Sequence, residues 1–131
     1  MEFEDYQPKK DHRDKTAEKS QWTISEIDEI KLFLRGFCNH WYNPSKEQIW
    51  AVTKDFTIIG EESRNSKNRG SKFTSLFFAK FTSDKQNVWH GYPISPYLNH
   101  DRTIPQSIIN DWLDRKIVEK SYMAKWQKGK I

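Results

Sequence analysis

The first strong pattern in the chain is an apolar stripe that follows Trp22. Apolar side chains recur there at intervals of three and four residues, as on one face of a helix: Ile27, Ile30, Leu34, Phe37, Cys38 and Trp41. Thr23 is placed to cap this helix, with Glu26 as the reciprocal partner of a capping box. Because a proline disfavours helical backbone at the residue before it, the pattern predicts a helix of roughly four turns that ends near Pro44.

A shorter helix and three strands are predicted next. Ser45 can cap a helix over residues 46–54, with Gln48 at the reciprocal position. From Phe56 onward the apolar period changes to two, which predicts strands over residues 56–60, 72–82 and 88–94. The connections between these strands are short, so we expect antiparallel pairing in a three-stranded meander.

Two further helices are predicted after the strands. Pro105 suits the first turn of a helix, and the apolar residues that follow it share one face as far as Lys116. A last helix is expected over residues 119–127, with Gly129 beyond its end. The order of elements predicts an α+β fold in which a small three-stranded antiparallel meander is flanked by N-terminal and C-terminal helices.

The first twenty residues are rich in charge and poor in apolar side chains. A segment of this composition cannot bury enough apolar surface to offset the entropy lost when it is ordered. We therefore expect residues 1–20 to form a flexible, disordered charged tail and residues 21–131 to form a single α+β domain. The alternative is that Phe3 and Tyr6 dock onto that domain.

The chain has 131 residues and one cysteine. A single cysteine excludes an internal disulfide and falls short of the ligands of a cysteine zinc site. The sequence contains no glycine-rich phosphate loop and no Gly-x-Ser-x-Gly turn, which argues against nucleotide hydrolysis and serine-hydrolase chemistry. Residues 1–20 contain no apolar run behind a basic cluster, and no stretch of the sequence approaches roughly 20 apolar residues, so we expect neither a cleaved signal peptide nor a membrane span. We expect a cytoplasmic protein without a metal, a cofactor or a membrane contact.

Positive charge is concentrated in two parts of the chain, although the net charge of the whole is only +4. Residues 64–90 contain six basic and one acidic side chain, a net charge of +5, and residues 107–131 contain six and three, a net charge of +3. Lysine and arginine neutralise phosphates, and aromatic rings stack on bases. The pattern favours a non-enzymatic protein that binds DNA or RNA through these residues: Arg64, Lys67, Arg69, Lys72, Trp89, Tyr92, Arg102, Lys120, Lys125 and Lys128.

His90 is the leading candidate for catalysis. It lies near the end of a predicted strand, in the sequence Trp-His-Gly-Tyr-Pro, and a histidine there can act as a general base. His100 and Asp101 follow closely and can supply an acid and an orienting carboxylate. These residues indicate a second function, a metal-independent ribonuclease or toxin-like effector, although a histidine between aromatic residues is also common as a structural group. A third possibility is a protein-interaction or inhibitor module with an aromatic surface.

Overall fold

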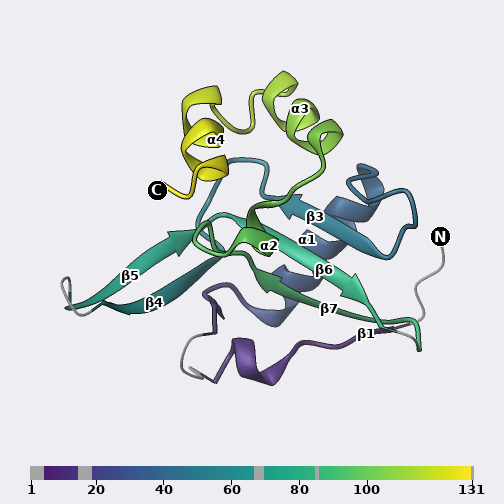
Figure 1. Cartoon of the computed structure of the whole chain (residues 1–131). Coiled ribbons are helices and arrows are strands. Elements are labelled where there is room, and N and C mark those ends of the chain that lie inside the picture. Colours follow the sequence, from purple (N-terminus) through teal and green to yellow (C-terminus); the bar gives the residue numbers. More distant parts are fainter. Residues whose placement is uncertain (1–4, 15–18, 67–69, 85, 131) are drawn as a thin grey trace.

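Two β-sheets form the framework of the fold (Figure 1). The computed structural model describes residues 5–14, 19–66, 70–84 and 86–130. One sheet has the order β1-β7-β6-β3 and consists of Asp5–Tyr6 (β1), Val88–Pro93 (β7), Phe78–Ser83 (β6) and Gln48–Val52 (β3). The other has the order β2-β4-β5 and consists of Gln21–Trp22 (β2), Gly60–Ser66 (β4) and Gly70–Leu76 (β5). The helices are α1 (Glu26–Cys38), α2 (Asn99–Arg102), α3 (Gln106–Asp114), α4 (Lys120–Gln127) and the 3₁₀ helix η1 (Lys10–His12).

The α+β class is confirmed, but the predicted three-stranded meander is wrong. β6 pairs antiparallel with both β7 and β3, and β1 pairs parallel with β7 at the edge of the sheet. α1 covers one face of this sheet and α2 lies over the opposite face (Figure 1). α3 and α4 pack where β6 begins, because Phe78 contacts Trp112 and Trp126.

Residues 46–54, predicted to form a short helix, contain the strand β3. It pairs with β6 from Gln48 opposite Thr82 to Val52 opposite Phe78. Ile49 and Val52 have no exposed surface. β-branched side chains suit a strand that is covered on both faces, and this burial outweighs the local capping signal at Ser45.

The predicted strand over residues 72–82 is two strands in two different sheets. β5 ends at Leu76 and β6 begins at Phe78. At the break, Phe77 stacks on Phe56 with 4.4 Å between the ring centroids. Both faces of the segment carry aromatic side chains, so the hydrophobic period gives no sign of the break. The strand predicted at residues 56–60 is also displaced, since β4 starts only at Gly60.

α1 begins two residues later than predicted and buries a different face. Its cap is Ser25, whose side chain accepts a hydrogen bond from the backbone N–H of Asp28 at 3.1 Å. The buried positions are Glu29, Leu32, Phe33 and Gly36, whereas Ile27 of the predicted stripe is 67% exposed. Gly36 explains the choice of face. A Cβ atom there would lie 2.5 Å from Ile49 Cγ2, so only glycine lets α1 approach β3 this closely.

The last strand and the two C-terminal helices are confirmed. β7 ends one residue before the predicted boundary, and α3 and α4 lie within the predicted ranges. The side chains expected to face inward from these helices are buried or partly buried: Ile108, Ile109, Trp112, Leu113, Tyr122, Met123 and Trp126. Among the described residues, no helix is both long and apolar enough to cross a membrane.

Residues 5–14, expected to belong to a flexible tail, contact the body of the fold. β1 pairs with β7, and the backbone N–H of Gln7 donates to the carbonyl of Trp89 at 2.9 Å. His12 is only 8% exposed. The composition of the segment gives no sign of this, because the group that anchors it, the buried carboxylate of Glu29, lies elsewhere in the sequence.

Candidate active site

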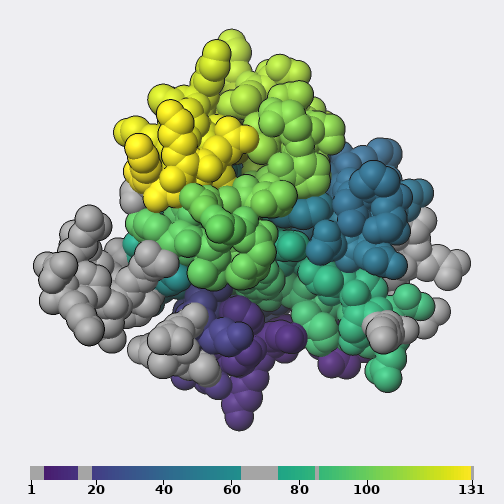
Figure 2. Space-filling view, in the orientation of Figure 1, coloured from purple at the N-terminus to yellow at the C-terminus, as the bar shows by residue number. Residues whose placement is uncertain are grey.

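A cavity of about 530 Å³ lies on the face of the four-stranded sheet that carries α2. Its walls come from the N-terminal segment, from Glu62 of β4, from the end of β6, from β7, and from α2 with the residues that precede it. Figure 2 views this face, with the N-terminal segment in purple below the α2 segment in green. Its volume is within the range of sites that hold small molecules or single nucleotides.

The alternation of side chains along β7 directs His90 and Tyr92 into the cavity. Trp89, Gly91 and Pro93 are buried, while the residues between them are half-buried and line the cavity. Gly91 is required here, because a Cβ atom would lie 2.1 Å from the ring of Phe81. The Trp-His-Gly-Tyr-Pro sequence therefore packs one face of the strand and presents polar groups on the other.

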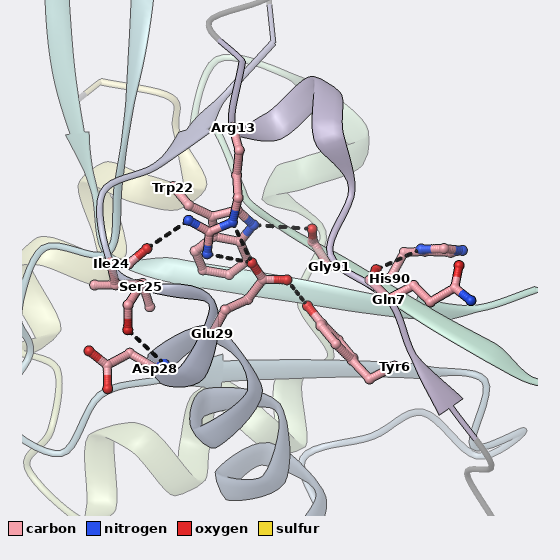
Figure 3. A network of polar contacts seen from close by, with 10 residues as sticks. All are labelled: Tyr6, Gln7, Arg13, Trp22, Ile24, Ser25, Asp28, Glu29, His90 and Gly91. Atoms are coloured by element: carbon pink, nitrogen blue, oxygen red, sulfur yellow. Dashed lines mark hydrogen bonds and ion pairs between the residues drawn. The ribbon is translucent and has the colours of Figure 1, made fainter.

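His90 is held by its main-chain and carboxylate neighbours. Its Nδ1 lies 2.9 Å from the carbonyl oxygen of Gln7 (Figure 3), and because a carbonyl only accepts, Nδ1 carries the hydrogen. Its Nε2 lies 3.6 Å from Oδ2 of Asp84. The backbone N–H groups of Val88 and Gln86 donate to Asp84 and lower the pKa of that carboxyl. The charged carboxylate can therefore pair with the ring when Nε2 is protonated.

His12 has a similar arrangement, and sequence reasoning missed it. Its Nδ1 donates to the carbonyl oxygen of Ser20 at 2.8 Å, and its ring stacks on Tyr92 with 5.1 Å between centroids. Burial lowers the pKa of His12, so the ring is neutral near pH 7. In that form Nε2 is an acceptor, and no partner for it is found in the described part of the chain. Only the surrounding fold distinguishes His12 from a histidine in a charged tail.

Asp101 joins α2 to the floor of the cavity. The side chain is 3% exposed; Oδ1 accepts from the Tyr92 hydroxyl at 2.9 Å, and Oδ2 accepts from the Ser95 backbone N–H at 3.0 Å. Burial and the Asp101 charge raise the pKa of Tyr92, so its hydroxyl remains a donor. His100 Nε2 lies 3.3 Å from Asp101 Oδ1, but its side chain is 69% exposed. The cavity thus brings together His90, His100 and Asp101, with His100 at its rim.

The charge in the cavity is mixed. Lys9 and Lys19 enter from the N-terminal side, while Asp84, Asp101 and Glu62 are the carboxylates of the lining. Neither lysine was predicted as a site residue. No group of three His, Cys, Asp or Glu side chains within the described ranges is placed to hold a metal ion. The cavity therefore holds histidines that can transfer protons, together with two lysines and three carboxylates.

The basic residues predicted to bind nucleic acid are only partly described. Lys67 and Arg69 lie outside the described residues, as do the side chains of Arg64 and Lys72, whose Cα atoms are partners across the β4–β5 ribbon. On α4 and just beyond it, the predicted lysines are exposed: Lys120, Lys125 and Lys128. Arg102, at the end of α2, packs against Gly129. A Cβ atom added to Gly129 would lie 2.4 Å from Nη1 of Arg102.

Trp89 does not fit its predicted role as a stacking platform. Its side chain is 1% exposed and its ring lies 5.2 Å from that of Phe33, on the α1 face of the sheet. Tyr92 lines the cavity, but one side of its ring is occupied by His12. Of the two predicted aromatic contacts, only Tyr92 is therefore placed to meet a ligand.

No protein-family model matches the chain, and comparisons with curated proteins and with solved structures give no match. A functional interpretation consequently depends on the geometry of the cavity. Its most informative feature is the pair His12 and His90, because each ring has one nitrogen fixed by a main-chain carbonyl. Such a bond determines which nitrogen carries the hydrogen and which is left for chemistry.

Proposed function

We propose that this chain binds single-stranded RNA in the cavity and cleaves it without a metal ion. The observation that carries the proposal is the shared arrangement of His12 and His90 in one cavity. Each ring donates from Nδ1 to a backbone carbonyl, which leaves Nε2 to accept or deliver a proton. Two groups in different environments are what acid–base catalysis needs, because one must start neutral and the other protonated.

The roles follow from these environments. His12, neutral because it is buried, takes the proton of the ribose 2′-hydroxyl at Nε2. The 2′-oxygen then forms a bond to phosphorus while the bond from phosphorus to the 5′-oxygen breaks. His90, whose Nε2 lies 3.6 Å from Oδ2 of Asp84, is the proposed acid and gives a proton from Nε2 to the leaving 5′-oxygen. The products are a 2′,3′-cyclic phosphate and a 5′-hydroxyl, with no change of oxidation state, and exchange with water restores both rings.

Lys9 and Lys19 support the same assignment. Both line the cavity on the side of His12, where a lysine ammonium can stabilise the negative charge that develops on the phosphate oxygens. The cavity volume of about 530 Å³ suits an unpaired nucleotide and is too small for a duplex. The required 2′-hydroxyl restricts cleavage to RNA.

Cleavage of a labelled RNA oligonucleotide in the presence of EDTA tests the proposal. His12→Asn and His90→Asn each keep an amide that can donate to the carbonyl now bonded by Nδ1, but remove Nε2. We expect each variant to lower the cleavage rate by about a hundredfold or more. His40→Asn is the matched control, since His40 is exposed and outside the cavity lining.

The chemical nature of the cleavage product and the choice of substrate test the proposal further. We expect a 2′,3′-cyclic phosphate end, and no cleavage of the all-deoxy oligonucleotide of the same sequence. Intact RNA after incubation with the wild-type protein would overturn the proposal. Equal rates for wild type and both histidine variants would do the same, because the cleavage would then come from another site or from contamination.

Binding of nucleic acid without cleavage is a second candidate, favoured by the exposed lysines of the C-terminal region. Figure 1 shows the β4–β5 ribbon extending away from the four-stranded sheet, and the sequence from residue 60 to residue 76 contains four basic and two acidic residues. Retention of intact strands that weakens steeply with salt would support this function. Binding to neither DNA nor RNA would leave the protein-interaction module as the remaining interpretation.

The contribution of α4 to such binding can be measured with two triple alanine variants. Replacing Lys120, Lys125 and Lys128 is expected to lower the slope of log Kd against log salt by roughly 0.7 for each single-strand phosphate that these lysines neutralise. The control replaces three exposed lysines elsewhere: Lys31, Lys46 and Lys54. An equal decrease in the two variants would show that only net charge matters.

A further inference from the structure

The N-terminal strap, defined as residues 5–14, supplies three groups to the cavity. Gln7 provides the carbonyl that holds His90 Nδ1, and Lys9 and His12 line the cavity directly. The backbone pairing of the strap is short, since β1 contains only Asp5 and Tyr6. Something other than strand pairing must therefore fix the positions of these groups.

A single carboxylate holds the strap at both ends (Figure 3). Glu29 of α1 has no exposed surface, and one of its oxygens accepts a hydrogen bond from the Tyr6 hydroxyl. The other accepts from Nε and Nη2 of Arg13 at 3.1 and 2.7 Å. Nη1 of Arg13 also donates to the carbonyl of Ile24 at 2.9 Å. Tyr6 and Arg13 flank the three cavity groups, so both ends of the functional stretch are attached to one point on α1.

Burial makes this attachment strong. A carboxylate without solvent contact is costly unless it is paired, and Arg13 supplies its opposite charge. Lifting the strap would leave Glu29 in the interior with neither partner. The free energy that keeps the carboxylate paired therefore also keeps the strap against the cavity.

We propose that Glu29 is a positioning residue for the histidine site: through Tyr6 and Arg13 it seats the strap, and so sets the tautomer of His90 and the place of His12. The inference rests on the proposed function for its catalytic consequence. Its structural part, the dependence of the His90 ring on the strap, stands on the contacts alone. Glu29 touches no cavity group itself and acts only through the strap.

The test reads the His90 ring directly, by nitrogen-15 NMR of the imidazole groups at about pH 8, where neutral rings predominate. In wild type we expect hydrogen on Nδ1 of His90. In Arg13→Ala the strap loses one attachment, and we expect the population with hydrogen on Nε2 to increase. Arg13→Lys keeps the charge and should restore part of the wild-type signal. Lys10→Ala, at an exposed position of the strap, is the matched control and should match wild type.

A second variant keeps the test valid if Arg13→Ala does not fold. Tyr6→Phe removes only the hydroxyl, while the ring keeps its packing on Phe33 at 5.0 Å between centroids. We expect the same direction of change at His90, and an RNA cleavage rate about tenfold to a hundredfold lower in Arg13→Ala. An unchanged His90 spectrum in folded Arg13→Ala and in Tyr6→Phe would overturn the inference.

Failure of the two proposals can be told apart. If the His90 tautomer changes in the variants but the wild-type protein cleaves no RNA, the ribonuclease function is wrong and the positioning role of Glu29 is supported. If RNA is cleaved but neither variant alters the rate or the His90 ring, the function is supported and the positioning role is wrong.

Discussion

The C-terminal helices and the N-terminal strap are attached to the rest of the fold by different physical means. α3 and α4 pack on Phe78, whose ring lies 5.0 Å from that of Trp112 and 4.8 Å from that of Trp126. The strap is held by the ion pair of Arg13 with Glu29 and by the bond from His90 to Gln7. Apolar packing is proportional to area and has little direction, whereas hydrogen bonds fix individual atoms. The side chains that line the cavity lie beside the strap, where hydrogen bonds fix the positions of individual atoms.

The buried aromatic side chains of the core include some polar atoms without partners. In the described part of the chain, the Nε1 atoms of four buried tryptophans have no hydrogen-bond partner: Trp50, Trp89, Trp112 and Trp126. An unpaired buried donor costs about 1–3 kcal/mol, so the apolar burial of these rings must exceed that cost. The strap shows a different balance: the Tyr6 ring packs on Phe33 and Phe81, while the polar groups of Tyr6 and Arg13 are paired with Glu29.

Phe78→Ala should have the largest effect on stability, because it removes the ring on which α3 and α4 pack. Removing a ring with no exposed surface should lower the free energy of unfolding by about 3–5 kcal/mol. Denaturant unfolding measures this, with Ile27→Ala, at a position 67% exposed, as a control expected within about 0.5 kcal/mol of wild type. A decrease at Phe78 as small as that at Ile27 would contradict the account of the C-terminal region.

Glu29→Gln should weaken the polar attachment of the strap, with a smaller effect on stability. It keeps the shape of the side chain but removes the charge that Arg13 binds, which should lower the free energy of unfolding by about 1.5–3 kcal/mol. Glu26→Gln on the exposed face of α1 is the control. Hydrogen exchange should be measured on both variants. We expect a loss of protection at residues 5–14 in Glu29→Gln but not in Glu26→Gln. Equal stability of the two variants would mean that the buried pair contributes nothing.

Ser25→Ala tests where the helix that carries Glu29 begins. Removing the cap on the Asp28 N–H should lower stability by about 1 kcal/mol. Thr23→Ala, at the cap expected from the sequence, should have a clearly smaller effect. A larger decrease in stability for Thr23→Ala than for Ser25→Ala would instead support Thr23 as the helix cap, as predicted from the sequence.

The smallest expected effect is a pH dependence of stability from His12. Burial lowers its pKa in the folded protein, so between that pKa and the ordinary value of about 6.5 the unfolded chain binds a proton that the folded chain does not. The free energy of unfolding should therefore fall as the pH is lowered below about 6.5. His12→Asn should weaken this fall and His40→Asn should not. An identical pH profile in all three proteins would show that His12 is not buried as described.

The same contrast explains what the sequence could predict. α3, α4 and β7 follow from local signals, such as Pro105 at a helix start and the alternation around His90. The strap does not, since Gln7 and His90 are 83 residues apart in the chain. β3 is a strand where local signals predict a helix, because its identity depends on pairing with β6. His90, His100 and Asp101 could be selected by residue type, whereas His12, Lys9 and Lys19 become site residues only through tertiary contacts.

The central claim is that His12 and His90 act on one phosphodiester, as base and acid. The most direct test is single-turnover cleavage of RNA in which the 5′-oxygen that leaves is replaced by sulfur, because a thiolate departs without an acid. We predict that His90→Asn cleaves this substrate at nearly the wild-type rate, while His12→Asn remains slow on both substrates. Equally slow cleavage of the sulfur substrate by both variants would contradict the assignment of His90 as the acid.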